Sequence, residues 1–285
     1  MLPYFLGCPS WNDNAWRESL YHGLRPGDFL SRYAQVFNAV EGNTTFYAWP
    51  SADTIRRWAE LMPAGFRFCA KFPRDISHAE DLRVQLSSAR TFLELLAPLG
   101  ERASPLWLQL PAGFGPDRLN ELKVFLSAMA PRCALAVEVR HLAFFDKGET
   151  ERALNRLLME LGVERVGLDS AALFSADPSE PAVRLAQAKK PRVPARALAF
   201  SEHPQVRFIG RLELAANDYY LAKWVTRVAD WIEGGKVPYV FLHTPDNRQA
   251  PELALRFHAQ LRERLPGLPA LPELSTADTE QLGLL

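Results

Sequence analysis

The sequence predicts an α/β protein, a single-domain (β/α)8 barrel of the TIM type. Eight short apolar strands are each followed by a stretch with helical periodicity, and these pairs fill residues 1–265. The runner-up, an open doubly wound sheet, is disfavoured because no Gly-rich dinucleotide turn follows the first strand. We therefore predict one barrel domain at 1–265 and a proline-rich tail at 266–285.

The strands are predicted from short apolar runs that end at turn residues. They are expected at 4–8, 37–43, 66–72, 106–110, 134–140, 164–169, 206–211 and 237–243. Between them, apolar residues recur at the three- and four-residue spacing of amphipathic helices. The exception is 170–205, which is rich in Pro, Ala and basic residues and has weak periodicity. We predict a long, irregular crossover there, between the sixth and seventh strands.

Composition limits the class of protein. The apolar share of 48% supports a large core, and the charged share of 23% is ordinary for a globular chain. Lys plus Arg number 33 and so do Asp plus Glu, so no overall charge attracts nucleic acid or a membrane. The three cysteines lack metal-type spacing, and from the residue pattern we expect neither a signal peptide nor a membrane-spanning segment. We expect a cytoplasmic protein with reduced thiols and no membrane partner.

Residues 37–47, FNAVEGNTTFY, place a carboxylate in an otherwise apolar strand. Side chains alternate along a strand, so Ala39, Glu41 and Asn43 share one face. A buried carboxylate is costly unless a cation or a hydrogen-bond donor meets it. We therefore expect polar groups from other strands to surround Glu41.

Charged or polar residues end almost every predicted strand. The C-terminal strand ends of a barrel hold its site, so we expect these residues to converge. They are Glu41, Asn43, Lys71, Arg74, His78, Gln109, Glu138, Arg140, His141, Asp169, Arg207, Arg211, His243, Asp246 and Asn247. The alternative for the whole set is that these residues are solvated loop edges. The alternative for Arg140 alone is that it only pairs with Glu138 or caps a neighbouring helix.

Two kinds of chemistry follow from this set. Its lysine and arginines would make a positive pocket, and Arg binds carboxylate and phosphate with two hydrogen bonds, so we expect a small anionic ligand. The candidate catalytic residues are Glu41, Lys71, Glu138 and Asp169. One carboxylate would act as a general acid or base, with His141 or His243 as a second proton carrier.

Two further features leave alternatives open. The three carboxylates and a histidine could instead hold a divalent metal, although HxH and HExxH spacings are absent, so the cofactor is left open. An aromatic wall over a ring-shaped substrate could be formed by Trp11, Phe46, Tyr47 and Trp49. The alternative for these aromatic residues is packing at the rim of the barrel.

The motifs LGCPSW, VEGNTTFY, KFPRDISH, LWLQLPAGF, AVEVRH and YVFLHTPDNRQAPELA occur in this order. Together they resemble the YecE-like family, domain of unknown function 72, from about Phe5 to about Leu261. The resemblance implies a (β/α)8 barrel and no established activity. The residues at matching motif positions are Trp11, Glu41, Asn43, Phe46, Tyr47, Lys71, Arg74, His78, Gln109, Pro111, Glu138, Arg140, His141 and Arg207. The chain departs from the family pattern at Cys8, Gln205, Ile209 and 243–247.

Three functions remain open at this point. The first is an enzyme using acid–base chemistry, as a hydrolase, lyase or isomerase, on a small phosphate- or carboxylate-bearing substrate. The second is a nucleic-acid-processing protein, endonuclease-like and metal-assisted, whose basic rim would contact phosphates. The third is a module that binds a small ligand without turnover. The oligomeric state is left open.

Overall fold

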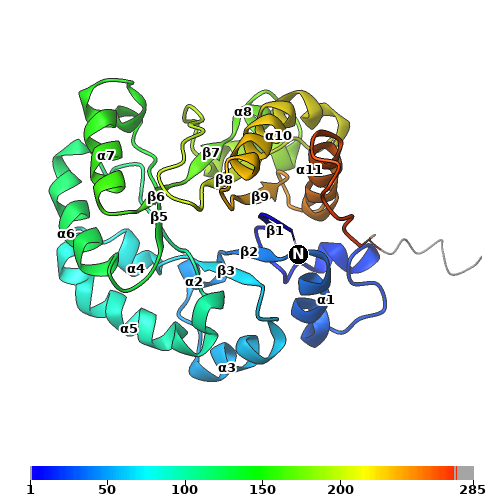
Figure 1. The fold of residues 1–285 in the computed structure, drawn as a ribbon, viewed down its shortest axis with the longest axis horizontal. Coiled ribbons are helices and arrows are strands. Elements are labelled where there is room, and N and C mark those ends of the chain that lie inside the picture. Colours follow the sequence, from blue (N-terminus) through cyan, green and yellow to red (C-terminus); the bar gives the residue numbers. More distant parts are fainter. Residues whose placement is uncertain (1, 273, 275–285) are drawn as a thin grey trace, which may run out of the picture.

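Parallel strands alternate with helices along the chain in the computed structural model, which describes residues 2–272 and 274 (Figure 1). The strands are β1 Phe5–Cys8, β2 Ala39–Gly42, β3 Arg67–Ala70, β4 Leu106–Gln109, β5 Leu135–Glu138, β6 Glu164–Arg165, β7 Gly167–Asp169, β8 Gln205–Ile209 and β9 Tyr239–His243. The helices are α1 Phe29–Val36, α2 Thr44–Tyr47, α3 Ala52–Leu61, α4 Arg74–Ser77, α5 Leu86–Leu96, α6 Leu119–Met129, α7 Glu149–Glu160, α8 Ala171–Phe174, α9 Pro181–Lys189, α10 Asp218–Glu233 and α11 Ala250–Arg264. The fold is therefore a single-domain α/β fold.

The strands form two parallel sheets. One has the order β3-β2-β1-β9-β8-β7 and the other β4-β5-β6. A single bridge, Lys71 to Trp107, links β3 to β4, and Val166 interrupts the predicted sixth strand so that its halves join different sheets. The α/β class is as predicted, but one closed eight-stranded sheet is not confirmed, because ladder pairing is incomplete at these two places.

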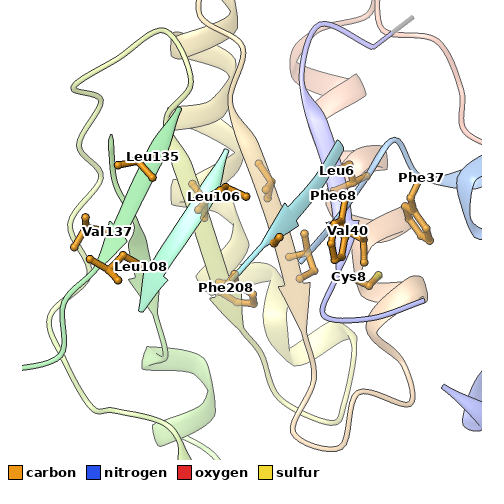
Figure 2. Close-up of a cluster of buried hydrophobic side chains, with 14 of the residues drawn as sticks. Leu6, Cys8, Phe37, Val40, Phe68, Leu106, Leu108, Leu135, Val137 and Phe208 are labelled. Atoms are coloured by element: carbon orange, nitrogen blue, oxygen red, sulfur yellow. The ribbon is translucent and has the colours of Figure 1, made fainter. Parts of the chain in front are cut away.

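The two faces of the strands bury different sets of side chains. The outer face packs against the helices in the main hydrophobic cluster, where Figure 2 labels Leu6, Val40, Phe68, Leu108 and Val137. The inner face contributes a second apolar cluster, and strands of both sheets share it. Its buried members are Ala39, Cys69, Trp107, Ala136, Val166, Tyr239 and Phe241. Polar residues two positions further along these strands therefore lie on the same inner face, nearer the C-terminal strand ends.

Close approach of β1 and β2 depends on a glycine. A Cβ atom added to Gly7 would lie 2.0 Å from the carbonyl oxygen of Ala39, its register partner on β2. Any larger residue would therefore push the two strands apart at the centre of the six-stranded sheet.

The crossover at 170–205, predicted to be irregular, contains α8 and α9, and residues 190–204 have no helix or strand. Pro181 starts α9, where its missing N–H costs nothing. The side-chain amide of Gln187 donates to the carbonyl oxygens of Leu173 and Ala176 and so ties α9 to α8. These contacts, more than helical periodicity, hold two short helices in place.

The first residues of the predicted tail, from 266 on, pack against α11. Leu268 is buried, and its carbonyl oxygen accepts a hydrogen bond from Arg262, while the carbonyl of Pro269 is 2.9 Å from Nε2 of His258. Residues 273 and 275–285 of that tail lie outside the described residues. Within residues 2–272 and 274, no helix combines the length and apolar character needed to span a membrane.

Candidate functional site

Glu41 lies at the centre of a buried group of charges on the inner face. Lys71 Nζ is 2.7 Å from its Oε1, and Arg207 donates through Nε to Oε2 at 3.0 Å. His243 Nε2 is also 2.6 Å from Oε2. Burial alone would raise the pKa of Glu41, but these three neighbours outweigh it and hold the pKa well below its usual range. Glu41 is therefore an ionised carboxylate at neutral pH.

Lys71 connects β2 to β4. Its ammonium group donates to Glu41 and also to Oε1 of Gln109 at 2.9 Å, and it lies 5.1 Å from the ring centroid of Trp107. The side chain is fully buried. Burial and the positive charge of Arg207 lower the pKa of Lys71 to about 8, although Glu41 acts in the opposite direction. Near pH 8 this amine is therefore only partly protonated.

Glu138 is the second buried carboxylate. Arg207 Nη1 donates to its Oε2 at 3.1 Å, and Arg140 contacts its Oε1 through Nε at 2.8 Å and through Nη2 at 2.6 Å. Burial acts to raise the pKa of Glu138, but Arg140, Arg207 and Lys71 lower it to about 2. Arg207 bridges both carboxylates, so residues from β2, β5 and β8 form one ion-pair network.

The His243 ring contacts Glu41 and has a defined protonation state. Burial lowers its pKa to about 4 despite the nearby carboxylate, so the ring is neutral at physiological pH. An ionised carboxylate only accepts hydrogen bonds, so Nε2, which faces Glu41, must carry the ring proton. Nδ1 then holds the lone pair, and it is buried with no hydrogen-bond partner among the described residues.

A rim of partly exposed residues adjoins the network. The pKa of His78 is lowered to about 4, first by burial and then by the positive charges of Arg140 and Arg74. The Phe46 ring lies 5.2 Å from the His78 ring, and Tyr47 packs edge-on against Phe46. Tyr47 is 78% exposed, so any ligand it contacts must also reach solvent.

Asp169 does not join the other carboxylates, which corrects its place among the candidate catalytic residues. In β7 it pairs in register with Phe208, whose side chain packs on the outer face, so Asp169 also points outward. There it accepts hydrogen bonds from the Ala171 backbone and from Trp224 Nε1, and it pairs with Lys223 at 2.7 Å. Its contacts tie β7 to α10.

Trp11 is likewise packing rather than an open wall. Its ring contacts Trp58 and Phe68 edge-on in the main core, and only 7% of it is exposed. The rim-packing alternative therefore describes Trp11, whose ring contacts Trp58 of α3.

Other predicted residues shape the surrounding loops. Asn43 donates to the Pro9 carbonyl oxygen at 2.8 Å, and His141 Nδ1 accepts from the Ala143 backbone. The Arg211 backbone is held by Asn217. Two positions belong to the loop after β9: Asp246 is exposed and binds Arg248, and the Asn247 carbonyl accepts from Trp16.

A cation that the sequence patterns did not indicate is Lys190, the residue after α9. Burial and Arg207 lower its pKa to about 7, with Glu41, Lys71 and Glu138 also acting on it. Lys190 in turn contributes to the lowered pKa of His243. It comes from the segment predicted as an irregular crossover, so no strand-end rule pointed to it.

The described residues do not form a divalent-metal site. No group of three or more His, Cys, Asp or Glu side chains in this part of the chain is arranged to hold a metal ion. The oxygens of Glu41 and Glu138 face Lys and Arg groups instead, and Asp169 points elsewhere. The donor set proposed from the sequence therefore does not assemble.

Comparisons with known proteins agree with the fold. The family model for "Protein of unknown function DUF72" matches residues 5–276. The UPF0759 protein YecE of Escherichia coli K12 is 42% identical over 276 residues, which cover 95% of this chain and 98% of the relative. The protein of the same name from E. coli O157:H7 matches equally well.

Two solved structures of DUF72 family proteins are also similar. The Thermotoga maritima MSB8 protein has a TM-score of 0.66 at 22% identity, covering 91% of this chain and 99% of that one. The Enterococcus faecalis V583 protein has a TM-score of 0.68 at 19% identity, covering 93% and 98%. These likenesses concern the fold. With the family match and the YecE identity, they show that this chain belongs to the DUF72 family, the YecE-like family that its motifs resemble.

Proposed function

We propose that this protein is an enzyme that moves protons on a small anionic substrate at the C-terminal strand ends. The observation that carries the proposal is the His243–Glu41 pair: a neutral imidazole fixed through Nε2, with Nδ1 buried and unpartnered among the described residues. A histidine held this way by a carboxylate is the usual arrangement of a general base. Nδ1 would accept the proton, and Glu41 would stabilise the imidazolium that forms.

We further propose that the strands enclose this site as a (β/α)8 barrel. The Lys71–Trp107 bridge links the two sheets on one side, and β6 and β7 are separated only by Val166 on the other. The inner-face cluster draws residues from both sheets, which supports one enclosed interior. Catalytic groups at the C-terminal strand ends are typical of such barrels.

The charge of the network favours an anionic substrate. Lys71, Arg140 and Arg207 outnumber the two carboxylates Glu41 and Glu138, and neutral His243 adds nothing at physiological pH. A buried excess of positive charge is stabilised when a phosphate or carboxylate binds nearby. The added negative charge would also raise the pKa of His243 and make it a stronger base.

Proton abstraction can be tested without knowing the complete reaction. The protein is incubated in D2O with pools of phosphorylated sugars and of small carboxylic acids, and exchange of carbon-bound hydrogen is followed by NMR. We expect deuterium to enter at least one compound with wild-type protein, and His243→Gln to reduce that rate by 10²-fold or more, the usual size of a general-base contribution.

The matched control is His258→Gln. His258 is equally buried, but Tyr4 and the Pro269 carbonyl contact both of its ring nitrogens, so it has no free base. Exchange that survives in His243→Gln at the wild-type rate contradicts the proposed base. Ligand binding by folded wild-type protein with no exchange in any compound favours the non-catalytic module instead.

A further inference from the structure

A cavity of about 310 Å³ lies at the N-terminal ends of the strands, away from the ion-pair network. Six of the residues that line it are the first residues of their strands, and they come from both sheets. They are Phe5, Arg67, Leu135, Glu164, Gln205 and Tyr239. We call this space the N-terminal cavity.

A layer of the inner-face cluster separates the N-terminal cavity from the network. Alternate residues of a strand share a face, so on β9 Tyr239 lines the cavity, Phe241 lies in the middle and His243 belongs to the network. Trp107 is part of the same middle layer, and its indole N–H donates to Oε1 of Gln205 at 3.2 Å on the cavity side. The cavity is therefore distinct from the candidate functional site.

Aromatic and aliphatic side chains form much of the cavity wall. Phe5 and Tyr239, register partners on β1 and β9, stack with their ring centroids 4.4 Å apart, and His203 meets Tyr239 edge-on at 5.9 Å. Pro105 and Leu135 add aliphatic surface. An apolar cavity of about 150 Å³ is enough to bind benzene, so the N-terminal cavity has room for one ring with a substituent.

Arg67 brings a cation without a charged partner to this wall. Its guanidinium carbon lies 5.3 Å from the centroid of the Phe5 ring, and Nη1 donates to the carbonyl oxygens of Ala64 and Phe66 at 3.2 and 3.1 Å. The Tyr239 hydroxyl, whose pKa is raised by burial, also hydrogen-bonds Arg67. These partners are all neutral at pH 7, and within the described residues Arg67 forms no ion pair.

The two carboxylates that line the cavity leave this charge uncompensated. Glu164 accepts hydrogen bonds from the backbone N–H groups of Phe200 and Ser201 and from the Ser201 hydroxyl, so its oxygens already have partners. Glu101 is exposed, and it does not pair with Arg67. An anion in the cavity therefore gains an arginine that no side chain of the described residues neutralises.

We infer that the N-terminal cavity binds a small ring-bearing carboxylate, with its ring against the apolar wall and its carboxylate on Arg67. Arg binds a carboxylate through two parallel hydrogen bonds, and an apolar wall with a few polar groups is typical of small-molecule sites. A neutral ring would leave the Arg67 charge unpaired, and a carboxylate without a ring would leave the wall in contact with water. The inference goes beyond the proposed proton transfer and does not depend on it.

The test measures binding of benzoate by calorimetry at pH 7, with benzamide and acetate as the probes that lack the charge and the ring. We expect saturable binding of benzoate at millimolar concentrations and much weaker binding of the other two. Arg67→Gln should weaken benzoate binding by about tenfold or more, the usual size of a lost charge-assisted hydrogen bond. The matched control is Arg90→Gln, because Arg90 is an exposed arginine of α5 outside the cavity and its loss should change nothing.

A second variant, Ala134→Phe, tests the cavity itself. Ala134 lines the cavity next to Leu135, so a larger side chain there takes up the space of the ligand ring while Arg67 stays in place. Benzoate binding should fall by about tenfold or more in this variant too, as expected when a ligand ring loses its apolar contacts. Circular dichroism establishes that each variant is folded.

Wild-type protein that does not bind benzoate overturns the inference. So does benzoate binding that is as tight in folded Arg67→Gln or Ala134→Phe protein as in wild type, because the ligand then binds elsewhere, for example at the ion-pair network. Benzamide or acetate binding as tight as that of benzoate overturns the assigned class of ligand.

Discussion

Replacing Glu138 by Gln tests the electrostatics of the network. The folded state lowers the pKa of this carboxyl from 4.5 to about 2, mainly because Arg140, Arg207 and Lys71 outweigh burial. One pKa unit corresponds to about 1.4 kcal/mol, so the ionised group stabilises the fold by about 3 kcal/mol at neutral pH. Loss of one partner from a buried ion pair costs about 3–5 kcal/mol, which agrees in size.

The dependence on pH distinguishes this mechanism from simple loss of packing. The ionised Glu138 carboxylate stabilises the folded protein at pH values above 4.5, the pKa of this group in the unfolded chain. This stabilisation is lost as pH falls toward 2, the pKa in the folded protein. We therefore expect urea unfolding to give a constant gap between wild type and Glu138→Gln from pH 7 to 5. The gap should narrow below pH 4.5.

The matched control is Glu149→Gln. Glu149 is an exposed carboxylate whose ion pairs with Arg152 and Arg156 are in solvent, so its loss should cost less than about 1 kcal/mol. A Glu138→Gln variant within about 0.5 kcal/mol of wild type at pH 7, or a gap that does not change with pH, refutes the reasoning.

Three other predictions follow. Because burial lowers the pKa of His243 from 6.5 to about 4, the wild-type protein should lose stability as pH falls from 6.5 to 4.5. The His243→Gln variant should lose less stability over the same range, as measured by urea unfolding midpoints at both pH values. Equal losses in the two proteins contradict this prediction. Gly7→Ala should fail to give soluble folded protein, because its added Cβ would clash with the Ala39 carbonyl oxygen. Gly113→Ala has open space around its added Cβ and should fold normally. Expression yield and circular dichroism of the two variants test this difference. Asp169→Asn should lower the Tm but leave His243-dependent deuterium exchange unchanged, and loss of exchange in folded protein returns Asp169 to the site.

The sequence is sufficient to predict the α/β class and most strands. Period-two alternation in 134–140 places Val137 on one face and Glu138 on the other, and the structure buries them in different environments. Closure of the sheet cannot be predicted in this way, because it depends on hydrogen bonds between strands that are distant in sequence. The break at Val166 and the single bridge at Lys71 have no local signal.

The candidate site is predictable where a residue belongs to a strand. Glu41, Lys71 and Glu138 each follow a small or apolar inner-face residue by two positions, and that periodicity indicates convergence. Applying this two-residue periodicity to Asp169 requires knowing which residues of its strand face inward. The interruption of the predicted sixth strand at Val166 changes which residues face inward, and Asp169 faces outward.

Residues outside the strands are harder to predict. The position of Lys190 depends on the packing of α8 and α9 onto Leu168 and Ile209, a tertiary contact that short, weakly periodic helices do not predict. The pairing of His243 with Glu41 also joins residues 202 positions apart. Spacing along the chain cannot indicate which His nitrogen faces a carboxylate.

The protonation state of His243 can be measured directly by ¹⁵N–¹H NMR of protein labelled at histidine, assigned by comparison with His243→Gln. At pH 7 we expect a neutral ring with the proton on Nε2 and an unprotonated Nδ1, converting to the charged form only near pH 4. A proton on Nδ1, whether in the other neutral tautomer or in a charged ring at pH 7, would leave no lone pair on Nδ1 and contradict the proposed base.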